Sequence, residues 1–136
     1  MRVLALDIGD RWVGTALSDP MKLFSKPFKT VQAYELDQFL KKTIVTESVS
    51  IVVVGHPKTL RGTESQQTKK VVQEKKRLEQ LFTDVQWVLW DERLTSKMAS
   101  RIKKAKTKED KVHGHSIAAA FILDSYLTYL QNKKNM

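Results

Sequence analysis

The sequence predicts an α/β fold built on a mixed five-stranded sheet with helices on both faces. In the stretch 2–19, two β-compatible apolar runs flank a short turn that contains Gly9, a pattern typical of a hairpin. Further along the chain, segments with helical apolar spacing alternate with short strand-like runs. A length of 136 residues, 41% of them hydrophobic, suits one domain with one core. We therefore expect residues 1–136 to form a single domain.

Five apolar or β-branched runs are short enough to be strands. Pro27 assigns the third run to a sheet edge, because proline cannot donate to a ladder. Trp87 and Trp90 are expected in the core on opposite faces, and base stacking is the minority interpretation. The predicted strands are Val3–Leu6, Trp12–Leu17, Lys26–Val31, Ile51–Val54 and Val85–Trp90.

Four segments have features of helices. The first carries Leu36, Phe39, Leu40, Ile44 and Val45 at helical spacing, and the second turns Val71, Val72, Leu78 and Leu81 inward. His113 is expected in a loop before the last helix. The predicted helices are Tyr34–Ser48, a segment from Thr63 or Ser65 to about Phe82, a segment starting at Thr95 or Ser96, and Ile117–Leu130.

The order of these elements predicts the topology of the sheet. Right-handed crossovers place the fourth strand beside the first and the fifth beyond it, which gives the order 3-2-1-4-5. Strands 1, 4 and 5 are then parallel. Their carboxyl ends meet at one edge, where open α/β sheets bind ligands. These ends carry Asp7, then Gly55-His56-Pro57, then Asp91-Glu92-Arg93.

Carboxylates at these strand ends suggest metal chemistry. Strands lie ~4.8 Å apart, so the ends of strands 1 and 5 are roughly 10 Å apart. Hard oxygen ligands select Mg²⁺ or Mn²⁺, and such ions activate water and stabilise the leaving oxygen in phosphodiester hydrolysis. Gly9 and Gly14 permit close backbone approach near Asp7. On spacing alone, two alternatives stay open: Asp7 starts a turn, or both acidic clusters are solvated strand ends.

The net charge of +9 and the pI of about 9.8 favour a polyanionic partner, with nucleic acid first. A basic surface tuned for solubility is the alternative. The basic residues between Lys97 and Lys111 cluster in one segment, and Lys103, Lys104 and Lys106 are expected to contact nucleic acid. The chain has no cysteine, which agrees with a reducing, cytoplasmic setting. No stretch is apolar enough for a membrane span.

Four pieces of the sequence resemble the YqgF/RuvX family, in the family's own order. These RNase H-like proteins are described as Holliday junction resolvases and as nucleases for the 5′ end of precursor 16S ribosomal RNA. The pieces cover most of the chain, so the resemblance implies an RNase H-like fold for the whole domain. They read LALDIGDRWVGTALSDP at 4–20, VVVGHPKTLRGTES at 52–65, LWDERLTSKMA at 89–99 and IAAAFILDSYL at 117–127.

The resemblance implies roles for individual residues. Asp7 matches the family's first catalytic acid, a metal ligand, and Glu92 matches the acid of its DER motif. Arg93 is a candidate for holding a scissile phosphate, or for pairing with the carboxylates beside it. The residues expected to shape the cleft are Gly9, Gly55, His56, Pro57, Gly62 and Asp91.

Two positions depart from the family pattern. The family commonly has an Asp just before the alanines of its last helix as a third metal ligand, and the alignment puts His115 there. A neutral imidazole can bind metal, so His115 is expected in the active site, with a helix cap or a surface position as the alternative. His56 replaces an apolar residue between Gly and Pro, and is expected to face the same cleft.

The leading hypothesis is a Mg²⁺- or Mn²⁺-dependent nuclease that processes the 5′ end of precursor 16S rRNA in ribosome biogenesis. One alternative is a Holliday junction resolvase acting on branched DNA in recombination and repair. Another is a non-catalytic nucleic-acid-binding protein of the same fold. Actin-like ATPases and sugar kinases also begin with a DxG hairpin, but they need two such domains. A junction-cutting enzyme needs two active sites, so both a monomer and a homodimer are open.

Overall fold

The computed structural model describes the backbone of residues 1–56, 66–91 and 108–134, and the side chains of these residues except 108–113 and 134. Five strands form one sheet in the order β3-β2-β1-β4-β5, as predicted. β1 is antiparallel to β2 and parallel to β4, and β4 is parallel to β5. The strands are β1 (Arg2–Ile8), β2 (Trp12–Ser18), β3 (Ser25–Gln32), β4 (Val49–His56) and β5 (Gln86–Asp91).

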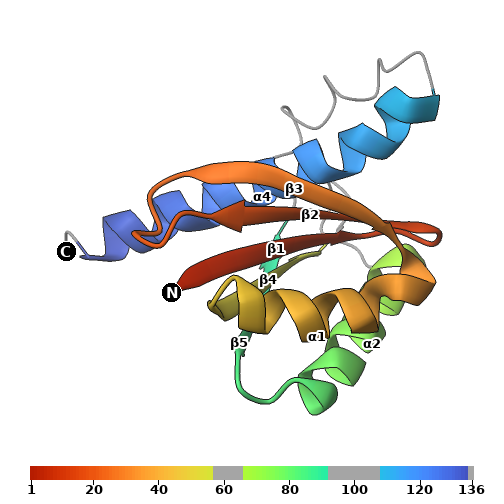
Figure 1. The fold of residues 1–136 in the computed structure, drawn as a ribbon, viewed down its shortest axis with the longest axis horizontal. Coiled ribbons are helices and arrows are strands. Elements are labelled where there is room, and N and C mark those ends of the chain that lie inside the picture. Colours follow the sequence, from red (N-terminus) through yellow and green to blue (C-terminus); the bar gives the residue numbers. More distant parts are fainter. Residues whose placement is uncertain (57–65, 92–107, 135–136) are drawn as a thin grey trace.

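Helices cover both faces of the sheet (Figure 1). α1 (Leu36–Thr46), which follows the 3₁₀ turn η1 (Ala33–Glu35), lies with α2 (Gln66–Leu81) on one face. α4 (Lys108–Lys134) crosses the other face. None of the helices in the described part of the chain is long and apolar enough to cross a membrane.

α4 begins well before the predicted start at Ile117, and His113 lies in this helix rather than in a loop. The prediction was wrong because the polar stretch from Lys108 to His113 has no apolar periodicity. A helix that is already packed further along needs no core contacts in its first turns. It also tolerates Gly114, at a cost of about 1 kcal/mol relative to alanine. The helix expected from Thr95 or Ser96, and the expected caps Thr63 and Ser65, lie outside the described residues.

Side-chain alternation along the strands gives the sheet two cores. The core beneath α1 and α2 contains Leu4, Leu6, Val13, Val52 and Val54 of the sheet, packed with Leu36, Leu40, Val71 and Leu78. The core beneath α4 contains Val3, Ala5, Ala16 and Val53, packed with Ala119, Ile122, Leu123, Tyr126 and Leu127. The central strands are therefore buried on both faces, as their uninterrupted apolar runs predict.

The two tryptophans of β5 face opposite cores, as predicted. Trp87 Nε1 donates to the Phe82 carbonyl at 2.9 Å. Trp90 Nε1 donates to Ser125 Oγ at 3.1 Å, and its ring packs edge-on against Tyr126 at 5.4 Å between centroids. Both indoles thus have a structural role that accounts for them without base stacking.

Two helix positions are more exposed than their spacing suggested. Leu81, predicted to point inward, is 56% exposed because it is the last residue of α2. Val45, near the end of α1, is 77% exposed.

Candidate active site

The carboxyl ends of β1, β4 and β5 meet at one edge of the sheet. Leu6 pairs with Val54, and Gly55 pairs with Trp90. Asp7, Gly55 and Trp90 therefore lie at one level on three neighbouring strands, on the face that α4 covers. Gly55 is buried and places no side chain between Asp7 and Trp90.

α4 places His115 next to Asp7. His115 Nδ1 lies 4.0 Å from Asp7 Oδ2, and the two side chains are 36% and 24% exposed. This distance is too long for a hydrogen bond. It is inside the upper limit of ~4.2 Å for two ligands of one divalent ion with bonds of ~2.1 Å, and the two side chains would have to move closer together to coordinate an ion as adjacent ligands. The chemistry of the pair, one carboxylate and one imidazole, suits Mn²⁺ and other transition ions as well as Mg²⁺.

Gly14 allows α4 to come this close. It pairs with Asp7 across the β1–β2 hairpin. A Cβ added to Gly14 would lie 1.9 Å from the His115 carbonyl oxygen and 2.7 Å from the Ser116 nitrogen. The backbone of α4 therefore rests directly on the glycine, and the His115 side chain reaches Asp7 as a result. The close approach predicted at this glycine is confirmed.

Gly9 closes the turn beyond Asp7. Its N–H donates to the Trp12 carbonyl at 3.0 Å. A Cβ at this position would lie 2.9 Å from the same oxygen and 4.0 Å from His115 Cε1. The tight turn thus borders the Asp7–His115 pair.

The other two predicted cleft residues in the described strands face away from Asp7. His56 pairs in register with Asp91. Alternation puts both side chains on the face of Val54 and Trp87, which α1 and α2 cover. His56 is buried there, at 7% exposure. The structure therefore brings His115, but not His56, to Asp7.

Several predicted site residues lie outside the described residues. They are Pro57, Gly62, Glu92, Arg93, Lys103, Lys104 and Lys106. Within the described side chains, no group of three metal-ligating residues gathers. Asp7 and His115 are thus two members of the predicted three-ligand set.

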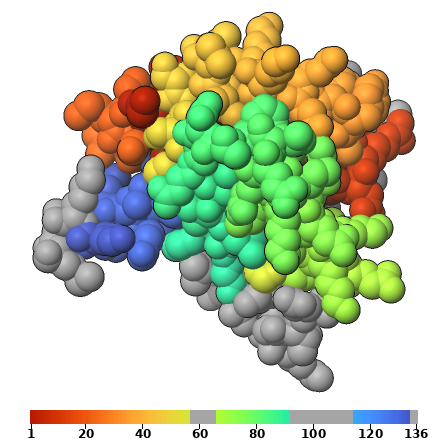
Figure 2. All heavy atoms as spheres, turned by 90° about the horizontal axis from the view of Figure 1, so that it is seen from below, coloured from red at the N-terminus to blue at the C-terminus, as the bar shows by residue number. Residues whose placement is uncertain are grey.

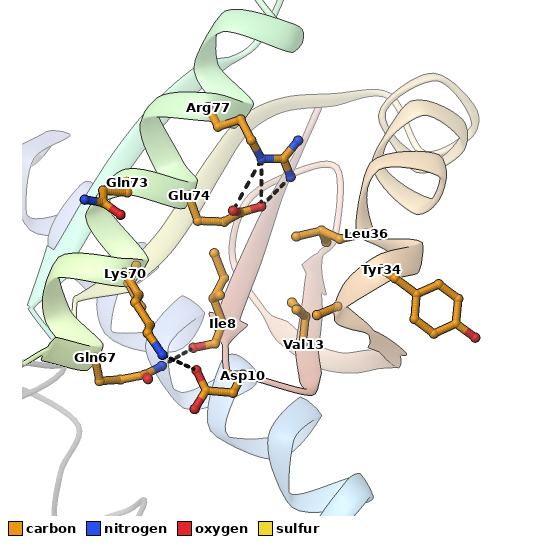
Figure 3. Close-up of a pocket in the computed structure, with 13 residues that line it drawn as sticks. Ile8, Asp10, Val13, Tyr34, Leu36, Gln67, Lys70, Gln73, Glu74 and Arg77 are labelled. Carbon is orange, nitrogen blue, oxygen red and sulfur yellow. Dashed lines mark hydrogen bonds and ion pairs between the residues drawn. The ribbon is translucent and has the colours of Figure 1, made fainter.

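A groove of about 640 Å³ lies beside Ile8, at the end of β1, on the face of the sheet that α1 and α2 cover (Figure 3). Its apolar lining includes Ile8 and Val71, and α2 forms one wall. Gln67 Nε2 donates to the Ile8 carbonyl at 3.3 Å, and Lys70 Nζ lies 3.6 Å from Asp10 Oδ1. These contacts tie α2 to the end of β1, directly after Asp7. Sequence periodicity gave no sign of them, because Gln67 and Lys70 read as exposed polar residues of the helix.

The charged side chains further along this groove pair with one another. Arg77 donates to both carboxylate oxygens of Asp37 at 2.8 Å and also pairs with Glu74. The hydrogen bond from Arg77 lowers the pKa of Asp37, and the same bond raises the pKa of Arg77. Arg77 therefore links α2 to α1, and the charged residues in this part of the groove have a structural role.

Sequence comparison places this site in a family. A family model described as RuvX, Holliday junction resolvase, matches residues 1–129. The chain belongs to the RuvX family. A relative from Rubrobacter xylanophilus, named "Putative pre-16S rRNA nuclease", is 37% identical over 127 residues, which cover 93% of this chain and 91% of the relative. A relative of the same name from Clostridium botulinum is 35% identical over 96% of this chain and 98% of its own length.

Solved structures confirm the RNase H-like fold expected of a RuvX chain. Thermus thermophilus RuvC matches with a TM-score of 0.58 at 12% identity, over 97% of each chain. T. thermophilus RuvC in complex with a Holliday junction substrate matches with a TM-score of 0.59 at 13% identity, over 96% of each chain. At these identities the likeness extends to the fold, and the family assignment rests on the sequence matches.

Proposed function

We propose that this chain is a metal-dependent nuclease that cleaves a phosphodiester bond at the 5′ end of precursor 16S rRNA, in the cytoplasm. The observation that carries the proposal is the Asp7–His115 pair at the carboxyl edge of the parallel strands. The names of the RuvX relatives supply the substrate. The net charge of +9 supports a polyanionic substrate.

The proposed metal ligands are Asp7, His115 and, from outside the described residues, Glu92. A divalent ion bound there would supply an activated water and would stabilise the leaving oxygen. Asp7 and His115 hold their ligand atoms on a strand and a helix that pack against each other, so the two side chains are near each other before any ion arrives. Arg93, Lys103, Lys104 and Lys106 are the proposed contacts to the substrate phosphates.

Branched DNA is the second candidate substrate. It is supported by the fold shared with the T. thermophilus RuvC–junction complex. We propose a homodimer for this activity, because cutting both strands of a junction needs two active sites. Cleavage of a labelled precursor rRNA 5′ leader and of a four-way DNA junction, side by side, distinguishes the two substrates.

The test compares Asp7→Asn with Asp10→Asn. Both changes remove one negative charge and keep the size of the side chain, but Asp10 is 72% exposed and pairs with Lys70. In Asp7→Asn we expect both the Mn²⁺ affinity, measured by calorimetry, and the cleavage rate to fall. The loss should exceed the ~10–100-fold that follows when a residue supporting a metal ligand is removed. Both should stay near wild type in Asp10→Asn. Equal effects of the two changes would refute a ligand role for Asp7.

The same assay tests His115. Imidazole favours transition ions over Mg²⁺, so the wild type should be more active with Mn²⁺ than with Mg²⁺. His115→Asp should shift this preference towards Mg²⁺, and His115→Ala should lower Mn²⁺ affinity. If neither change alters the ratio of the two activities, His115 is not a ligand. A chain that binds RNA but cleaves neither substrate would be a non-catalytic binding protein.

A further inference from the structure

Apolar side chains stand out from the sheet at the end opposite Asp7. They belong to the connection between β2 and β3, residues 19–24, which we call the β2–β3 loop. Met21 and Phe24 are 72% and 71% exposed, and Leu23 is 46% exposed. Figure 2 shows this loop, in orange, projecting from the upper left of the molecule beside the N-terminal residues.

The conformation of the β2–β3 loop is built by Asp19. Its carboxylate accepts hydrogen bonds from the backbone N–H groups of Met21, Leu23 and Phe24 at 3.1, 2.8 and 2.7 Å. The Asp19 carbonyl accepts a further bond from the Lys22 N–H at 3.0 Å. These hydrogen bonds therefore fix a loop conformation in which the apolar side chains are exposed to solvent. Three exposed apolar side chains in one short loop make this loop a candidate interaction site.

The surroundings of the loop are basic. Apart from Asp19, whose carboxylate is bonded to the loop backbone, residues 19–34 contain no acidic residue, and they include Lys22, Lys26 and Lys29. Lys26 and Lys29 are exposed on β3, the edge strand, where Lys26 pairs with Leu17. Thr30, one residue after Lys29, pairs with Gly14, the partner of Asp7. The lysines thus follow the sheet edge from the loop, and Lys26 shares the face of Leu17, which α1 and α2 cover, opposite the face that carries Asp7.

We propose that the β2–β3 loop is an apolar wedge that inserts into base-paired nucleic acid, while Lys22, Lys26 and Lys29 hold its phosphates. Proteins insert Phe, Leu and Met side chains between base steps in this manner. The lysines match a polyanion, whereas a second copy of the chain on this surface would bring like charges together. The inference rests on the proposed function for the class of partner, and adds a contact site separate from the proposed catalytic residues.

The geometry sets the distance between wedge and cleavage. Gly14 lies at the level of Asp7, and the loop begins about five residues further along the chain. At a rise of ~3.4 Å per residue, the loop is roughly 17 Å from the level of Asp7. The wedge is therefore expected to contact the duplex about 17 Å from the scissile phosphate. We infer a substrate with a duplex stem next to the cut strand.

The test measures binding without cleavage. Full-length protein is titrated in EDTA with a stem–loop RNA that carries 2-aminopurine at successive stem positions, so that unstacking raises fluorescence. Phe24→Ala should abolish the rise and weaken binding about tenfold, within the range measured for lost stacking contacts. The salt dependence should not change, because no phosphate contact is lost. Lys26→Ala should instead flatten the slope of log K against log salt by about 1, because one phosphate contact is lost. Val45→Ala, equally exposed but on α1, is the control and should match wild type.

Two results would overturn the wedge. One is an unchanged 2-aminopurine signal and affinity in Phe24→Ala. The other is a wild-type dimer by light scattering that Phe24→Ala converts to a monomer with unaltered RNA binding, which would assign the loop to a second copy of the chain. Asp7→Asn serves as the reference for the proposed function: loss of cleavage with a retained 2-aminopurine signal separates the catalytic proposal from the wedge.

Discussion

Replacing Gly14 by alanine tests how the candidate active site is assembled. The added Cβ would lie 1.9 Å from the His115 carbonyl oxygen. Ordinary carbon contacts begin near ~3.4 Å, so the helix must retreat by about 1.5 Å from the sheet. The obstacle is the backbone of α4, which is anchored by Ala119, Leu123 and Leu127 in the core. No side-chain rotation can relieve this clash.

The magnitude follows from two opposing terms. Alanine lowers the entropy of the unfolded chain and so stabilises by about 0.4–1 kcal/mol. Overpacking costs about 1–3 kcal/mol, and more when backbone must move. We expect the clash to dominate, with a net loss of about 3 kcal/mol in the free energy of unfolding. For a chain of this size that corresponds to a fall of about 10 °C in Tm.

Gly9→Ala gives a graded comparison, because its Cβ would meet the nearest atom, the Trp12 carbonyl oxygen, at 2.9 Å rather than 1.9 Å. Urea unfolding followed by far-ultraviolet circular dichroism gives both free energies, provided that the slope with urea is unchanged. Gly9→Ala should lose about 1 kcal/mol. Equal stability of the two variants, or Gly14→Ala within about 0.5 kcal/mol of wild type, would refute the packing argument. Gly14→Ala should also bind Mn²⁺ more weakly, because His115 is displaced from Asp7.

Two further predictions concern charged groups that brace the fold. The hydrogen bond from the Phe24 N–H, with those from Leu23 and Met21, lowers the pKa of Asp19. This stabilisation is present above the ordinary Asp pKa of ~3.9 and is lost as pH falls through the lowered value. The difference in urea midpoint between wild type and Asp19→Asn should therefore shrink below pH ~4, and a constant difference would contradict the assignment. Arg77→Met should cost no more than about 1 kcal/mol, because Arg77 and Asp37 are 45% and 46% exposed. A larger loss in the same unfolding assay would show that this surface pair is stronger than its exposure implies.

The sheet could be predicted from the sequence because the signals that define its strands are local. Each strand is a short apolar run, and the handedness of crossovers leaves one order for the parallel strands. The same reasoning placed Asp7 at the end of a buried strand. It also identified Gly14 as a site of close approach, although nothing local could name α4 as the element that approaches.

The limits of sequence reasoning lie at contacts between distant segments. The start of α4 was misplaced because its polar first turns have no periodicity. His56 was expected beside Asp7, but the alternation of side chains along β4 turns it to the other face. The face of His56 follows from the strand register, which the sequence motif does not contain. Gln67 showed no functional signal, since its bond to Ile8 joins residues that only the fold brings together.

The position of Asp7 depends on packing more than on charge. α2 is joined to the end of β1 by the Lys70–Asp10 pair, whose side chains are 66% and 72% exposed. Such a pair contributes about 0–1 kcal/mol and weakens with salt. Val71, on the same helix, is 1% exposed in the core beneath α1 and α2, and a buried side chain of this kind contributes about 1.5–3 kcal/mol. Buried packing on one face and the Gly14 contact on the other therefore fix the strand end. The exposed charges of this pair can change, as in Asp10→Asn, without moving the carboxylate that is proposed to bind metal.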